Sequence, residues 1–176
     1  MRTSRPVRAA FTLVELMIVV VLMGIIAVSV IPAIGSVQGM REGAARDEVG
    51  RMLEVAKARA IASGVPCGLE IDLNESSLTI VRLSDAGSIE DLSDPLTMRA
   101  RSVVLPSVFS GVTLSGLTNG DGVGGSGIIW FNYEATPHTR TSGGALEATN
   151  SSNATIELSS GQQVVVHAYT GVVELP

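Results

Sequence analysis

The sequence predicts an α+β fold in which a long N-terminal helix packs on an antiparallel β-sheet head. Two observations lead to this prediction. A membrane-length apolar run near the N-terminus continues into a stretch whose apolar residues recur at helical spacing, as far as about residue 64. From residue 65 onward, apolar residues form short runs of period two between turn residues, a pattern typical of antiparallel strands.

The apolar run covers residues 10–34 and carries a single charge, that of Glu15. As a helix, residues 16–34 are long enough to cross a hydrocarbon core of about 30 Å at a rise of about 1.5 Å per residue. We therefore expect residues 11–34 to form a transmembrane helix. The run is longer than the apolar region of a conventional secretory signal peptide, which has roughly 7–15 residues.

The carboxylate of Glu15 is expensive within such a helix. It costs about 2.5–3.5 kcal/mol at the membrane centre and less towards the interface. Glu15 is therefore expected either to pair with a cation or to lie at the headgroup boundary of an ordinary signal-anchor, where it reaches water.

The residues before and after Glu15 form a specific motif. A basic leader with Arg2, Arg5 and Arg8 precedes the small residue Ala10. The sequence Phe-Thr-Leu-Val-Glu-Leu at residues 11–16 then leads directly into the apolar run. This pattern resembles the N-terminus of the type IV pilin and type II secretion pseudopilin superfamily, although that family normally has Gly where Ala10 stands.

The resemblance implies that residues 1–10 are a leader peptide, which a prepilin peptidase removes between Ala10 and Phe11. The same enzyme would methylate the new amine of Phe11, and Glu15 would pair with the amine of a neighbouring subunit in a filament. The implied partners are the prepilin peptidase, other pilin or pseudopilin subunits and an inner-membrane assembly platform. The implied location is the bacterial inner membrane, with a single span and the head in the periplasm.

Residues 35–64 are expected to continue the helix in amphipathic form. Their apolar positions recur at helical spacing, namely Ala45, Val49, Met52, Leu53, Ala56 and Ala60. Glu42 with Arg46 and Asp47 with Arg51 are spaced for ion pairs on the opposite face. Gly64-Val65-Pro66 is expected to end the helix.

Residues 65–176 are expected to form the antiparallel β head. The expected strands are residues 68–73, 78–83, 102–105, 108–114, 128–133, 155–158, 164–169 and 172–175. Residues 119–127 and 139–153 are rich in Gly, Ser, Thr and Asn and are expected to be surface loops. Gly171 between the last two expected strands resembles the C-terminal region of GspH/FimT-type pseudopilins.

The head carries twelve acidic and four basic side chains, a net charge of −8. This balance disfavours nucleic-acid binding, which is built from Lys and Arg contacts to phosphates. Cys67 is the only cysteine, so no intrachain disulfide is possible, and it is expected to be a structural core residue. His138, in an expected loop, and His167, in an expected strand, lack neighbours that would orient them for catalysis. No catalytic, metal or cofactor site is expected, and the chain is not expected to be an enzyme.

The predicted function is that of a minor pseudopilin or pilin subunit of a type II secretion pseudopilus or a type IV pilus. Two alternatives remain open at this stage. The chain could be a major pilin, or it could be a signal-anchored periplasmic β domain that binds or hydrolyses a ligand.

Overall fold

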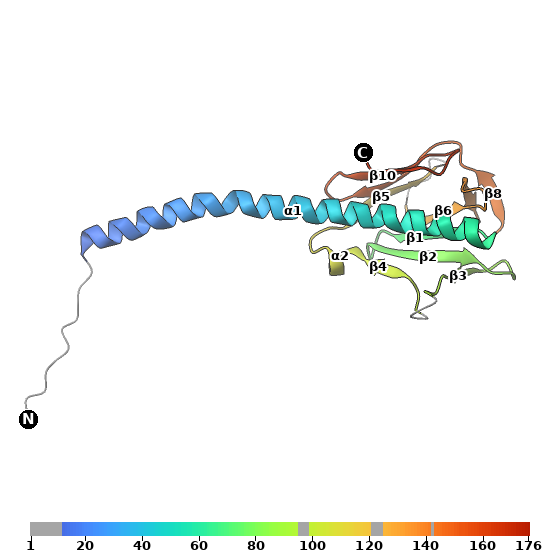
Figure 1. Ribbon diagram of the computed structural model, residues 1–176, viewed down its shortest axis with the longest axis horizontal. Helices are drawn as coiled ribbons and strands as arrows, with labels where there is room; N and C mark the ends of the chain where they lie inside the picture. Colours follow the sequence, from blue (N-terminus) through green and yellow to red (C-terminus); the bar gives the residue numbers. More distant parts are fainter. Residues whose placement is uncertain (1–11, 95–98, 121–124, 142) are drawn as a thin grey trace, which may run out of the picture. The chain divides into compact units, whose positions relative to one another are not determined.

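The computed structural model describes residues 12–94, 99–120, 125–141 and 143–176, and for residues 29–34 and 36 it describes the backbone alone. The chain forms two compact units, one up to Gly39 and one from Met40 to Pro176. Helix α1 (Leu13–Ser63) contributes to both units. The strands and the short helix α2 (Leu105–Val108) belong to the second unit (Figure 1).

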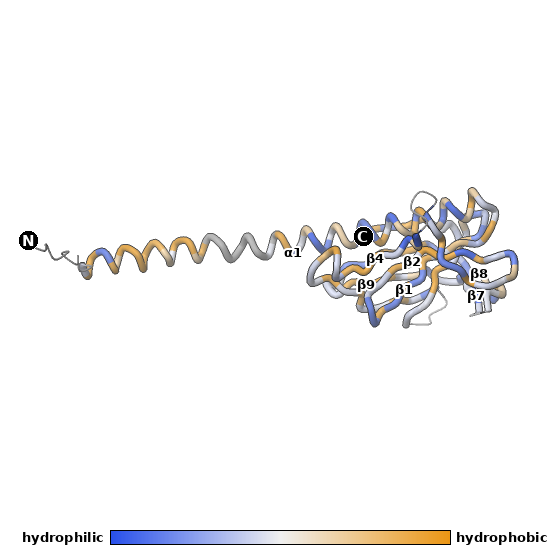
Figure 2. The backbone as a smooth tube through the Cα atoms, turned by 90° about the horizontal axis from the view of Figure 1, so that it is seen from below, coloured by the Kyte–Doolittle hydropathy of each residue, from blue (hydrophilic) through white to orange (hydrophobic). Residues whose placement is uncertain are grey.

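In the first unit, α1 is predominantly hydrophobic over residues 13–28 (Figure 2). Its large apolar side chains there are all exposed. Among the described residues, no helical stretch meets the length and hydropathy required of a membrane span.

In the second unit, α1 buries the face that the helical spacing predicts. Its core side chains have no exposed surface: Ala45, Val49, Met52, Leu53, Ala56 and Ala60. On the polar side, Arg51 pairs with Glu48, in place of the expected Asp47, and Lys57 pairs with Glu54 at 2.6 Å. The amphipathic second half of the helix is therefore confirmed.

The helix ends at Ser63, as the Gly-Val-Pro signal predicts. Gly64 adopts a left-handed conformation with φ of 69°, which glycine accepts without strain. The Gly64 N–H donates to the Ala60 carbonyl at 3.0 Å, and the Ser63 hydroxyl donates to the Arg59 carbonyl at 2.7 Å. The carbonyls of Arg59 and Ala60 thus have partners before the chain turns into the first strand.

The strands form two antiparallel sheets. The first sheet has the order β3-β2-β1-β6-β7-β8, with β4 also paired to β2. Its strands are β1 (Cys67–Asp72), β2 (Ser77–Leu83), β3 (Ile89–Asp91), β4 (Ser102–Val104), β6 (Gly127–Phe131), β7 (Pro137–Arg140) and β8 (Leu146–Thr149). The second sheet has the order β11-β10-β9-β5 and contains β5 (Leu114–Asn119), β9 (Ala154–Leu158), β10 (Gln163–Val166) and β11 (Val173–Glu174).

A single hydrophobic core joins α1 to both sheets. The first sheet contributes Leu69, Ile71, Leu78, Ile80, Ile129 and Phe131, and the second contributes Ile156, Leu158, Val164 and Val166. Figure 1 shows both sheets beside the second half of α1. The predicted α+β fold, a helix packed on an antiparallel sheet, is therefore confirmed.

Two of the expected segments are wrong. The expected strand at residues 108–114 is absent: α2, with Pro106 in its first turn, ends at Val108, residues 109–113 form a turn and irregular structure, and β5 begins only at Leu114. Gly111, with φ of 86°, also interrupts an extended conformation there. The expected surface loop at residues 139–153 contains part of β7 and all of β8. All four residues of β8 are exposed, so no apolar alternation marked this strand in the sequence.

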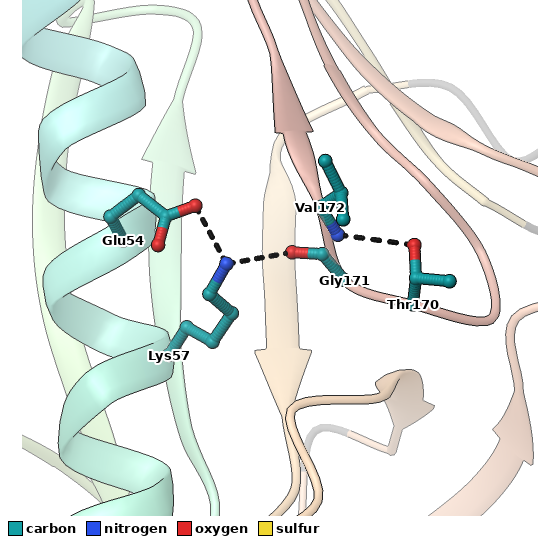
Figure 3. A network of polar contacts seen from close by, with 5 residues as sticks. All are labelled: Glu54, Lys57, Thr170, Gly171 and Val172. Atoms are coloured by element: carbon teal, nitrogen blue, oxygen red, sulfur yellow. Dashed lines mark hydrogen bonds and ion pairs between the residues drawn. The ribbon is translucent and has the colours of Figure 1, made fainter.

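The C-terminal segment, residues 171–176, is fastened along α1. The Lys57 ammonium donates to the Gly171 carbonyl at 3.1 Å while it pairs with Glu54 (Figure 3). One Arg46 N–H donates to the Pro176 carbonyl at 2.8 Å, and the Leu175 side chain packs over Gly50, where a Cβ would lie 3.0 Å from it. Gly171 itself has φ of 61°, and a Cβ there would collide with the Ala135 carbonyl, so this turn requires glycine.

Candidate assembly interface

Thr12 caps the N-terminus of α1. The Leu16 N–H donates to the Thr12 carbonyl at 3.2 Å, and the Glu15 N–H donates to the Thr12 hydroxyl at 3.3 Å. Thr-x-x-Glu is the spacing of a capping box, in which Glu15 is the third helical residue. The sequence-based expectations do not include this capping role of Thr12, although its spacing from Glu15 could have predicted it.

Glu15 lies in the first helical turn, exposed to solvent. The helix dipole stabilises a carboxylate at this place by about 0.3–1 kcal/mol. Within the described part of the chain, no Lys, Arg or His forms a salt bridge with Glu15. Ala10 and Phe11, the other two predicted site residues, lie outside the described residues.

The exposed apolar side chains of residues 13–28 cover every side of the helix. They are Leu13, Val14, Leu16, Met17, Ile18, Val19, Val20, Val21, Leu22, Met23, Ile25, Ile26 and Val28, each between 44% and 78% exposed. A helix that is hydrophobic all round is stable when it is buried on all sides. Burying one such side chain contributes about 1.5–3 kcal/mol, so this segment has a large free energy to gain from lipid or from other helices.

His138, Arg140 and Trp130 form a polar cluster in the head. His138 in β7 pairs with Trp130 in β6 and is only 2% exposed, which differs from the expected polar loop. The Arg140 Nε–H donates to His138 Nε2 at 2.7 Å, and an Arg140 Nη1–H donates to the Gly144 carbonyl at 2.6 Å. The Arg140 guanidinium also lies 6.0 Å from the Trp130 ring centre. His138 is therefore committed as a hydrogen-bond acceptor and is closed to solvent.

Burial, together with the neighbouring Arg140 charge, lowers the pKa of His138 to about 4. Its ordinary pKa, which it recovers on unfolding, is about 6.5. Between these values the unfolded chain binds a proton that the folded chain does not. The unfolding free energy is therefore expected to fall by up to about 3 kcal/mol as the pH drops from 6.5 to 4, and to level off below that.

Urea unfolding at a series of pH values measures this effect. His138→Asn keeps an acceptor near Arg140 and removes the titration, so its unfolding free energy should lose this step between pH 6.5 and pH 4. An equal pH dependence in the variant and the wild-type chain would show that His138 is not its source.

The first sheet carries an acidic groove of about 670 Å³ on the face that includes Trp130 and Arg140. Its carboxylates are Glu70, Asp72, Asp91 and Glu147. Burial, followed by the negative charges of Asp91 and Asp72, raises the pKa of Glu70. Such a groove repels phosphates, in line with the overall charge of the head.

The remaining side chains considered for chemical reactivity are those of Cys67 and His167. Cys67 is buried at the start of β1, and burial raises the pKa of its thiol, which makes it a poor nucleophile. His167, just beyond β10, lies 2.8 Å from the Glu174 carboxylate, which ties β10 to β11. Among the described residues, no group of three or more His, Cys, Asp or Glu is placed to hold a metal ion.

Comparison with known proteins agrees with these features. Residues 5–31 match the model of the prokaryotic N-terminal methylation motif. No curated protein matches the chain by sequence. A structure of the minor pseudopilin EpsH from the type II secretion system of Vibrio cholerae is similar to 77% of this chain and 94% of its own, with a TM-score of 0.56 and 13% identity. A second EpsH structure covers 74% of this chain and 92% of its own, with a TM-score of 0.54 and 13% identity.

The chain thus carries a prepilin-type methylation motif at the start of its helix, and it has the fold of a minor pseudopilin. The family model confirms the methylation motif that residues 10–16 predict, and the EpsH structures confirm the predicted fold class.

Proposed function

We propose that this protein is a minor pseudopilin or pilin subunit, which is processed by a prepilin peptidase and assembled into a type II secretion pseudopilus or a type IV pilus. One observation carries the proposal. The methylation motif at residues 5–31 leads into a helix whose apolar side chains are exposed on every side, and the same helix packs its second half into the core of the head. The N-terminal half of the helix is thus suited to burial among lipids or other helices, whereas its second half belongs to a folded head.

The site residues have distinct roles in this proposal. The peptidase cleaves between Ala10 and Phe11 and methylates the amine of Phe11, so residues 1–10 are lost. Residues 11–34 lie first in the inner membrane and then in the filament core, and residues 35–64 continue the helix into the periplasmic head of residues 65–176. Glu15 pairs with the amine of a neighbouring subunit, because a carboxylate buried without a cation is costly.

The proposal includes no enzymatic activity and no nucleic-acid partner. His138 and Arg140 hydrogen-bond to each other and to backbone carbonyls. The negative charge of the head opposes contact with a polyanion. The partners are the prepilin peptidase, sibling subunits and the inner-membrane assembly platform.

Co-purification tests this function. The epitope-tagged chain, extracted from membranes in mild detergent, is expected to carry sibling prepilins with it, in a copy number well below that of the most abundant one. A copy number equal to that of the most abundant subunit of the fibre would indicate a major pilin instead. Migration as a single chain without siblings would favour a signal-anchored periplasmic domain.

A further inference from the structure

Three segments of the head meet at Gly171, and each carries an exposed apolar or aromatic side chain. Lys57 in α1 reaches the Gly171 carbonyl, and Ile61 follows it one helical turn later. The turn at residues 132–136 abuts Gly171 through the Ala135 carbonyl. The loop after β10 contains Gly171 itself.

The exposed large apolar and aromatic residues of these segments are Ile61, Tyr133, Tyr169 and Val172, which we call the tyrosine patch. Tyr133 is 60% and Tyr169 is 76% exposed, and these are the only two tyrosines of the chain. Ile61 and Val172 are each about half exposed. Both tyrosines therefore lie on turns that touch each other, in a chain of which only 3% is aromatic.

A surface of this composition is typical of a protein-binding site. Exposed apolar groups rimmed by polar residues mark interaction surfaces, and tyrosine is enriched among the side chains that carry binding energy. The junction is also well fixed. Lys57, Gly171 and the His167–Glu174 pair hold the loop, and the Asn132 carboxamide oxygen accepts N–H bonds from Glu134 and Thr136 within the turn. Little conformational entropy is lost when such a surface is covered.

The charges around the patch indicate the kind of partner. Glu134 follows Tyr133 directly, and Glu174 lies two residues beyond Val172. The Lys57 ammonium is already bound to Glu54 and to the Gly171 carbonyl. A second copy of this head, with its own net charge of −8, would bring like charges together.

We propose that the tyrosine patch docks an apolar surface, rimmed by basic side chains, on the head of a different subunit of the same filament. The choice of a sibling subunit as partner rests on the proposed function. The patch itself involves neither the N-terminal motif nor the acidic groove of the first sheet.

The binding experiment uses the full-length chain in detergent, with each purified sibling pseudopilin of the same cell, and with a second copy of this chain, as probes. Tyr133→Ala and Tyr169→Ala are each expected to weaken binding to one sibling by roughly tenfold or more. Leu146→Ala removes an equally exposed apolar side chain from β8 and is expected to leave the affinity within about twofold of wild type. Glu134→Lys should weaken binding and change its salt dependence, whereas Glu147→Lys, with the same charge change in the groove, should not.

Several results would overturn the docking proposal. These are equal affinity of the tyrosine variants and the wild-type chain, equal losses in the Leu146 and tyrosine variants, binding of a second copy through the patch, or no binding to any sibling. Processing of the same preparation is checked by its mass. If the chain is cleaved and incorporated normally but the tyrosine substitutions do not change its affinity for any sibling, the patch is refuted and the proposed function is not.

Discussion

Glu15→Gln is expected to reach the membrane at the wild-type level but to be nearly absent from filaments. The substitution removes a charge that is unfavourable in lipid, so insertion should be retained or improved. In the assembled bundle it would leave the amine of a neighbouring Phe11 buried without its anion. Loss of one partner from a buried pair costs about 3–5 kcal/mol, which corresponds to a loss of incorporation of roughly a hundredfold to several thousandfold.

The structure supplies the control that this experiment needs, because Glu15 also lies in a capped first turn. Glu15→Gln keeps the Thr-x-x-Gln form of the capping box, whereas Glu15→Ala does not. Thr12→Ala removes the cap at a cost of about 1 kcal/mol and leaves the carboxylate in place. If charge pairing drives assembly, both Glu15 variants fail and Thr12→Ala assembles.

The amounts of each variant in sheared filaments and in membranes, measured at equal expression, decide between these roles. Normal incorporation of Glu15→Gln would refute the pairing role. Failure of Thr12→Ala to the same degree as Glu15→Gln would assign the effect to helix capping instead.

The sequence predicted those parts of the fold that depend on local periodicity. The buried face from Ala45 to Ala60 follows helical spacing, and the helix stops at the Gly64 signal because glycine accepts a left-handed conformation there. The hairpin of β1 and β2 was also predicted, since both strands are apolar and are separated by a polar turn.

The parts that were missed depend on contacts between distant residues. The strands β3, β7 and β8 are short and largely polar, so they are specified by pairing with their neighbours rather than by a pattern of their own. The burial of His138 follows from its position opposite Trp130, which no spacing in the sequence reveals. No spacing in the sequence reveals the hydrogen bond between Lys57 and Gly171 either, because these residues are 114 positions apart. This bond holds the loop that carries part of the tyrosine patch.

Processing of the N-terminus is expected to have the largest effect, because it either occurs or does not. Cells that contain an active prepilin peptidase should convert the whole population to a chain that begins at Phe11, since residues 5–31 match the methylation motif. Cells without the peptidase should retain Met1. Ala10→Gly restores the residue that resembling sequences usually have before the cleaved bond, and it should be processed at least as fast as the wild-type chain.

The most direct test of the central claim is the intact mass of the protein purified from the cell envelope. The expected mass is that of residues 11–176 plus one methyl group, with the methyl group on the amine of Phe11 in a fragment spectrum. A mass that retains Met1 despite an active peptidase, or a chain that begins beyond Pro32, would contradict it.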